Sequence, residues 1–87
     1  MTDALDGNAI AGQLLAAFGR ELTTAATVCA SCGTHSRVGQ LLVYRRAPGS
    51  VVRCPACATV VMILFEKHGI TCVDLLGLSA LEPTPDE

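Results

Sequence analysis

The sequence predicts a single small α+β domain, in which an N-terminal helix packs on an antiparallel sheet of three to four strands. The chain has only 87 residues, so a hydrophobic core alone would give marginal stability. Apolar residues recur at helical spacing near the N-terminus, whereas β-branched runs separated by turn residues fill the remainder. Two Cys-x2-Cys pairs, separated by 21 residues, would tie distant parts of that sheet together.

Residues 7–18 are expected to form the helix, which fills the N-terminal segment 1–20. Its apolar side chains recur every four residues: Ile10, Leu14 and Phe18. This spacing gives one apolar stripe along a helix. Asp6 or Asn8 could cap the first turn by accepting free amide hydrogens, and Gly19 stands where a helix ends.

The middle of the chain is expected to contain a connecting stretch and then a hairpin. Residues 21–28 are rich in threonine and become a short strand before the first cysteine pair. Residues 38–46 and 50–53 are predicted strands. Proline and glycine within 47–49 favour a turn between them.

A second hairpin follows the second cysteine pair. Residues 59–65 give the strongest strand signal, and 70–76 form the returning strand after a two-residue turn at His68-Gly69. Residues 78–81 would form either one helical turn or an extended tail. Together these elements divide the single domain into the helix, a sheet over 21–77 and a tail over 78–87.

The 59–65 strand is apolar on both of its faces. One face carries Val60, Met62 and Leu64, and the other carries Val61, Ile63 and Phe65. A strand of this kind has to be covered twice, and one short helix covers only one face of a sheet. Unless residues 78–81 cover the second face, we expect it to bind a partner protein or a second copy of the chain.

The two Cys-x2-Cys pairs predict a metal site whose ligands are Cys29, Cys32, Cys54 and Cys57. Four thiolates at such spacing are typical of a structural Zn²⁺ ion, and the 21-residue separation lies one residue beyond the usual window. A tetrahedral ion held by four thiolates has no open position for water or substrate, so we expect no enzymatic activity.

The cysteine count and the first residues favour a reducing compartment. An odd number of cysteines suits four ligands and one spare thiol better than disulfide pairs. The N-terminus is acidic where a secretory signal would be basic, and the longest apolar run is too short to span a bilayer. We expect a cytoplasmic protein without a membrane segment.

Charge is spread unevenly along the chain. The segment 22–65 has no acid and a charge of +4, whereas 1–21 carries −2 and 66–87 carries −4. The positive charges of segment 22–65 are Arg37, Arg45, Arg46 and Arg53. These arginines could contact phosphates, but the overall charge of −2 does not favour general nucleic-acid binding.

Residues 29–76 resemble the zinc ribbon superfamily, on the strength of the two cysteine knuckles, the hairpin between them and the long strand that follows. The whole chain, with Leu5-Asp-Gly-Asn-Ala9 and the Tyr44-Arg-Arg-Ala-Pro-Gly49 hairpin, also resembles a group of short, uncharacterised actinobacterial zinc-ribbon proteins. The resemblance implies zinc binding by the four cysteines, and within the superfamily it implies roles in transcription, translation or protein docking.

Three functions are open at this point. The first is a structural-zinc module that binds another protein or itself, and the second is a ribbon associated with nucleic acid or ribonucleoprotein. The third is an electron carrier, because the same cysteine loops resemble those of rubredoxins, which hold iron. The few aromatic residues, and Ala58 where rubredoxins carry glycine, argue against iron.

Three further residues are candidates for a role near the metal. His35 could be an alternative ligand or a hydrogen-bond donor to sulfur, although a turn histidine is the simpler interpretation. His68 is expected in the second hairpin turn, and Cys72 is expected to be a small buried apolar residue within a strand.

Overall fold

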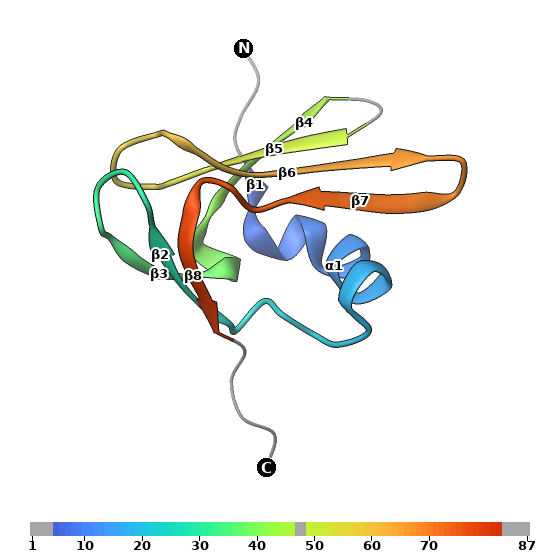
Figure 1. Cartoon of the computed structure of the whole chain (residues 1–87), viewed down its shortest axis with the longest axis horizontal. Helices are drawn as coiled ribbons and strands as arrows, with labels where there is room; N and C mark the ends of the chain where they lie inside the picture. Colours follow the sequence, from blue (N-terminus) through green and yellow to red (C-terminus); the bar gives the residue numbers. More distant parts are fainter. Residues whose placement is uncertain (1–4, 47–48, 83–87) are drawn as a thin grey trace.

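The computed structural model describes residues 5–46 and 49–82, which form two antiparallel sheets and an N-terminal helix (Figure 1). The elements are β1 (Leu5–Asp6), η1 (Gly7–Ile10), α1 (Ala11–Phe18), β2 (Ala26–Cys29), β3 (His35–Arg37), η2 (Val38–Gln40), β4 (Leu42–Arg46), β5 (Gly49–Arg53), β6 (Val60–Lys67), β7 (Ile70–Asp74) and β8 (Leu78–Glu82). One sheet has the order β1-β4-β5-β6-β7 and the other β3-β2-β8.

The α+β class is confirmed, but the expected number of three to four strands is wrong. The described residues form a five-stranded sheet and a three-stranded sheet. Two of the missed strands, β1 and β3, have two and three residues, which is too short to show a period. The residues expected as a tail form β8, which pairs with β2 (Thr27 with Leu81).

The helical segment has the predicted ends, but its first turn is tighter than an α-helix. The carboxylate of Asp6 accepts a hydrogen bond from the Asn8 amide at 3.0 Å, and η1 precedes α1. Gly19 takes a left-handed conformation with φ of 73°, and its amide donates to the Leu15 carbonyl at 2.8 Å. Only glycine adopts this backbone freely, so the helix ends there.

Residues 38–40 form a 3-10 turn (η2) instead of the first part of the predicted strand. The Val38 amide donates to the Ala25 carbonyl at 3.0 Å, and the Gly39 amide donates to Thr23 at 2.8 Å. These amides bond to a loop and not to a neighbouring strand. A Cβ atom at Gly7 would lie 1.7 Å from the Val38 carbonyl oxygen, so glycine is required where η1 packs on η2.

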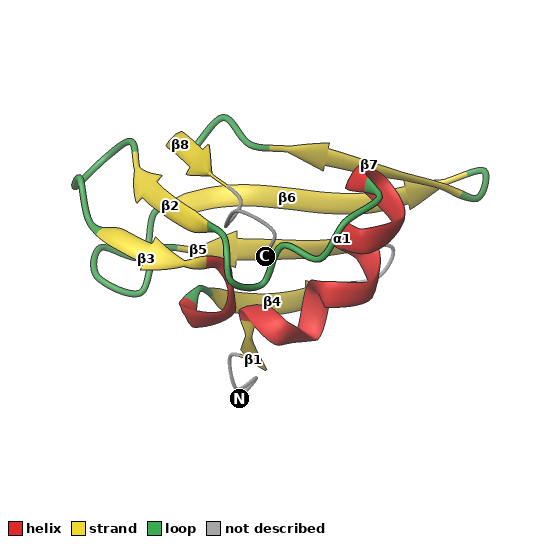
Figure 2. Cartoon of the chain, turned by 90° about the horizontal axis from the view of Figure 1, so that it is seen from below, coloured by secondary structure: helices red, strands yellow, loops and turns green. Residues whose placement is uncertain are grey.

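The core lies between the five-stranded sheet and the helical segment. In Figure 2, η1 and α1 cross one face of this sheet, and η1 contacts β4 whereas α1 contacts β7. We call this the inner face. The buried side chains that it contributes to the core are Val43, Val52, Met62 and Leu64.

The opposite, outer face of the five-stranded sheet stays open in the described chain. Its apolar side chains include Tyr44, Val51, Ile63, Phe65, Ile70 and Cys72, as the strand register and alternation place them. Ile63 and Phe65 are 38% and 39% exposed. A β-bulge opposite Val52 lets β6 bury both Val61 and Met62, so the strand that is apolar on both faces is covered on one of them only.

The two predicted hairpins both form. β6 and β7 are joined by His68 and Gly69, whose φ angles of 54° and 77° are those of a type I′ turn. β4 pairs with β5 from Leu42 with Arg53 to Arg46 with Gly49, while residues 47–48 of the predicted turn lie outside the described residues. In the described part of the chain, no helix is long and apolar enough to cross a membrane.

Candidate metal centre

The structure brings the four predicted thiols together in one group: Cys29, Cys32, Cys54 and Cys57. Their sulfur atoms all lie within 4.8 Å of one another. The Sγ atoms of Cys29 and Cys57 are 3.7 Å apart, and so are those of Cys32 and Cys54. These distances are far longer than a disulfide bond of about 2.05 Å, so the thiols are free.

The first knuckle connects β2 to β3 and is closed by its own backbone. The Gly33 amide donates to the Cys29 carbonyl at 2.9 Å, and the Cys29 amide donates to the Thr34 carbonyl at 3.0 Å. Gly33 has a φ of 76°, which turns the chain back after Cys32. The Ala30 amide also donates to Gly77 at 3.0 Å, which holds the knuckle against the connection from β7 to β8.

The second knuckle connects β5 to β6 and repeats this geometry. The Ala58 amide donates to the Cys54 carbonyl at 2.9 Å, and the Cys54 amide donates to the Thr59 carbonyl at 2.9 Å. Ala58 has a φ of 63°, the same left-handed conformation that glycine takes in the first knuckle. Because β2 and β5 belong to different sheets, the four thiols join the two sheets.

Burial alternates within each knuckle. The first cysteine of each pair is buried, with Cys29 and Cys54 exposing 4% and 1% of their surface, whereas Cys32 and Cys57 are exposed. Burial raises the pKa of the Cys54 thiol, although its sulfur accepts a hydrogen bond from the Ala56 amide at 3.4 Å. A buried thiolate needs a cation beside it, and the centre of the thiol group is where that cation would lie.

Two threonines stabilise the exposed thiolates. The Thr34 hydroxyl lies 3.0 Å from the Cys32 sulfur, and hydrogen bonding to Thr34 lowers the pKa of Cys32. Hydrogen bonds from the side chain and backbone of Thr59 lower the pKa of Cys57 to about 6. The sequence analysis did not identify these threonines. The signal was a Cys-x-Thr pattern that each cysteine pair shares: Cys32-Gly33-Thr34 and Cys57-Ala58-Thr59.

Two of the distances between sulfur atoms match those around a tetrahedral metal ion, and all of them are within 4.8 Å. With metal–sulfur bonds of about 2.3 Å, the edges of a regular tetrahedron of sulfurs measure about 3.8 Å. The two distances of 3.7 Å agree with this value. The four cysteines are therefore positioned to bind a metal ion, with the ligand chemistry that suits zinc or iron.

The other residues singled out in the sequence lie apart from the four thiols. His35 begins β3, so it is not in a turn, and it does not belong to the thiol group. His68 lies in the type I′ turn at the far end of β6, as predicted. Cys72 lies on the outer face of β7 and is half-buried, so the expectation of a buried side chain is wrong.

Three of the four arginines of segment 22–65 have described side chains, and these bond to three different segments. The guanidinium of Arg37 donates to the Thr24 carbonyl at 2.6 Å, and that of Arg45 donates to the carbonyl of Ala9 in η1. The guanidinium of Arg53 donates to the Ala58 carbonyl. The side chain of Arg46 lies outside the described residues. Arg37, Arg45 and Arg53 thus each support the backbone of a different segment.

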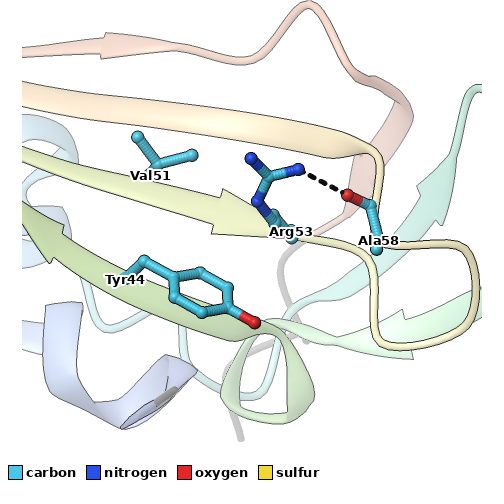
Figure 3. A pocket seen from close by; sticks show the side chains of 4 residues that line it. All are labelled: Tyr44, Val51, Arg53 and Ala58. Carbon is cyan, nitrogen blue, oxygen red and sulfur yellow. Dashed lines mark hydrogen bonds between the residues drawn. The ribbon is translucent and has the colours of Figure 1, made fainter. Parts of the chain in front are cut away.

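A hollow of about 370 Å³ lies on the outer face beside the second knuckle (Figure 3). Tyr44, Val51, Arg53 and Ala58 line it. The Arg53 guanidinium donates to the Ala58 carbonyl at 2.8 Å and lies 5.9 Å from the centre of the Tyr44 ring. Arg53 therefore links the second knuckle to β4 and also offers a positive charge to whatever enters the hollow.

A model of the family DUF6510, described as a family of unknown function, matches residues 1–86. Because the match spans nearly the whole chain, the chain belongs to this family. The family description names neither a zinc ribbon nor an activity. The searches of curated proteins and of solved structures gave no match.

Proposed function

We propose that this member of DUF6510 binds one structural Zn²⁺ ion through Cys29, Cys32, Cys54 and Cys57. The observation that carries this proposal is the group of four thiols within 4.8 Å of one another, with ligands drawn from both sheets. The ion would neutralise thiolates that are costly to bury and would clamp the two knuckles together. Four protein ligands complete a tetrahedral shell, so the proposed ion stabilises the fold and does not catalyse a reaction.

The proposed role of the zinc-held domain is to bind another protein through the outer face of the five-stranded sheet. Ile63 and Phe65 are exposed there, next to the hollow that contains Arg53. These exposed apolar side chains, with the positive charge of Arg53 beside them, fit a partner segment that is apolar and carries a carboxylate. The separate positions of Arg37, Arg45 and Arg53 give less support to the nucleic-acid alternative.

Metal analysis of the purified protein tests the zinc site. We expect about one zinc atom per chain, and we expect Cys54→Ser to lose both the zinc and the cooperative thermal transition. Cys72→Ser is the matched control, because Cys72 lies outside the thiol group and should leave both unchanged. A red protein containing iron would favour the electron-carrier alternative. Metal-free protein that still unfolds cooperatively would contradict the proposal.

Affinity capture from the native host tests the partner role. Proteins retained by the wild-type chain should be lost with Ile63→Lys, which places a charge on the outer face. Ala17→Lys is the control, because it places the same charge on an exposed position of α1. If both variants capture the same proteins as the wild type, the outer face does not bind them.

A further inference from the structure

The edge of β7 is the least protected strand edge of the five-stranded sheet. β7 ends the strand order, and no described strand pairs with its second side (Figure 2). Natural edge strands are usually shielded by charged residues (above all lysine), by proline, by a bulge or by a covering helix or loop. β7 has one charged residue, Asp74, at its end. The sequence Ile-Thr-Cys-Val-Asp of β7 contains no proline and no lysine, and its pairing with β6 has no irregularity.

The backbone groups at this edge follow from the hairpin geometry. In a two-residue hairpin, the residues that flank the turn form a hydrogen-bonded pair, here Lys67 and Ile70. Hydrogen-bonded and non-bonded positions then alternate along the strand. Thr71 and Val73 therefore direct their N–H and C=O groups away from β6. These two residues lie symmetrically on either side of Cys72.

Exposed apolar side chains flank the same edge on both faces of the sheet. On the helical side, α1 packs against β7 and exposes Leu15 and Phe18, which are 51% and 41% accessible. On the strand itself, Ile70 is 65% exposed, and Leu76, two residues after β7, is 88% exposed. A partner that extends the sheet at β7 would cover these side chains while it satisfies the free backbone groups.

We propose that a second copy of this chain pairs with β7 in antiparallel orientation, about a two-fold axis at Cys72. Thr71 then forms a hydrogen-bonded pair with the partner's Val73, and Val73 does so with the partner's Thr71. In such a pair the two residues exchange both of their N–H···O=C bonds. If the register were shifted along β7, one of these two residues would be paired with a residue outside β7. The Cys72-centred register uses both, and two-fold symmetry repeats each contact.

The charges near the edge complement each other in this register. Asp74 lies opposite the partner's Ile70, which neighbours the partner's Lys67 on the same outer face. In this register the carboxylate of Asp74, which accepts the Leu76 amide at 2.9 Å, and the ammonium group of the partner's Lys67 lie on either side of the partner's Ile70, and the symmetric contact repeats this. The contact uses the strand edge and not the outer face, so it goes beyond the proposed partner role and would stand if that role failed.

Sedimentation equilibrium of the full-length, zinc-loaded chain tests the contact. We expect a mass of twice 9.0 kDa, or about 18 kDa. Thr71→Pro removes an outward N–H that β6 does not use, so the monomer should still fold and bind zinc. The dissociation constant of the dimer should rise by about 100-fold or more, because the partner's Val73 carbonyl loses its donor. Thr71→Val is the matched control and should change that constant by less than about threefold.

The Cys72-centred register can be tested separately, with variants that do not introduce proline. Ile70→Asp places a carboxylate opposite the partner's Asp74 and should weaken the dimer by about tenfold, whereas Ile70→Lys should preserve it. Cys72 would face the partner's Cys72 as a non-hydrogen-bonded pair at a Cα distance of about 4.5 Å, within reach of a disulfide. Oxidation by an azodicarboxamide, which takes up the two protons and two electrons of the thiols, should link the wild-type chain but not Cys72→Ser.

Several results would overturn the inference. A zinc-loaded chain that remains monomeric up to about 0.5 mM has no such contact. A dimer that tolerates Thr71→Pro pairs through another surface. Equal dimer dissociation constants for Ile70→Asp and Ile70→Lys, or no link through Cys72, would rule out the Cys72-centred register. Zinc content measured on the same samples separates these outcomes from a failure of the metal site.

Discussion

Ala58 has the more strained backbone of the two residues that turn the knuckles. Its φ of 63° is left-handed, a conformation that costs a residue with a Cβ atom about 1–2 kcal/mol. The equivalent residue in the first knuckle is Gly33, with a φ of 76°. The same backbone hydrogen bonds close both knuckles, so the knuckle takes this conformation whichever residue stands there.

We therefore predict that Ala58→Gly stabilises the zinc-loaded protein by about 0.5–1 kcal/mol, after the greater freedom of glycine in the unfolded chain is subtracted. Gly33→Ala should destabilise it by about 1–2 kcal/mol. Thermal unfolding of the two variants, each beside the wild type, measures both effects. A lower melting temperature for Ala58→Gly would show that the left-handed residue is not strained.

The threonine contacts predict how zinc binding depends on pH. Zinc binding needs thiolates, so zinc affinity should fall as the pH decreases and protons compete for sulfur. Hydrogen bonds from Thr59 lower the pKa of Cys57 from 9.0 to about 6. A group with a lowered pKa in the folded state favours that state above its unfolded pKa, and this preference is lost as the pH falls through the folded value. The decline should therefore be steepest below about pH 6.

Calorimetric zinc titrations in buffers of different ionisation enthalpy measure the protons released. At pH 7, the Cys57 side chain should contribute little to the protons released, because it is mostly a thiolate before zinc binds. Thr59→Val should raise the pKa of Cys57 and increase proton release, while Thr24→Val, at an exposed position away from the thiols, should not. Zinc affinity that stays constant from pH 8 to about pH 5 would contradict this assignment.

At the scale of elements, the sequence predicted those whose signals are local. The helix ends at Gly19 because glycine is required there, and the His68-Gly69 turn is of the type that joins two strands directly. The cysteine spacing identified all four thiols that the structure brings together. The second sheet was missed because its strands are short and pair residues far apart in sequence, such as Val28 with Ala80.

Other parts of the fold depend on contacts that no local pattern encodes. Residues 38–40 look like the start of a strand, but Val38 and Gly39 bond to the 23–25 loop and bend into η2. The bulge beside Val52 decides which side of β6 is buried, and alternation alone does not show a bulge. The supporting role of the threonines required the knuckle geometry.

β8 should contribute measurably to stability, although the sequence suggested only a tail. Leu78 and Leu81 are partly buried and pack against the core, and β8 pairs along β2. We predict that Leu81→Ala lowers the free energy of unfolding by about 1–2 kcal/mol, less than for a fully buried leucine. Glu82→Ala, at the exposed next position, should change it by less than about 0.5 kcal/mol. Equal effects in urea unfolding would mean that β8 does not support the core.

At the scale of the whole molecule, the group of four thiols lies where the two sheets meet. One knuckle belongs to the three-stranded sheet and the other to the five-stranded sheet, and each buries one cysteine. A chain of 87 residues has little stability to spare. A structural zinc ion contributes apparent binding free energy of about 10 kcal/mol or more, enough to decide whether such a chain folds.

The most direct test is to record amide NMR spectra of ¹⁵N-labelled protein before and after a strong chelator removes the metal. We predict dispersed amide resonances in the purified protein, collapse of that dispersion after chelation, and recovery on addition of one equivalent of Zn²⁺. Dispersed resonances that persist in protein shown by elemental analysis to be metal-free would contradict the claim that four thiolates around one ion hold the two sheets together.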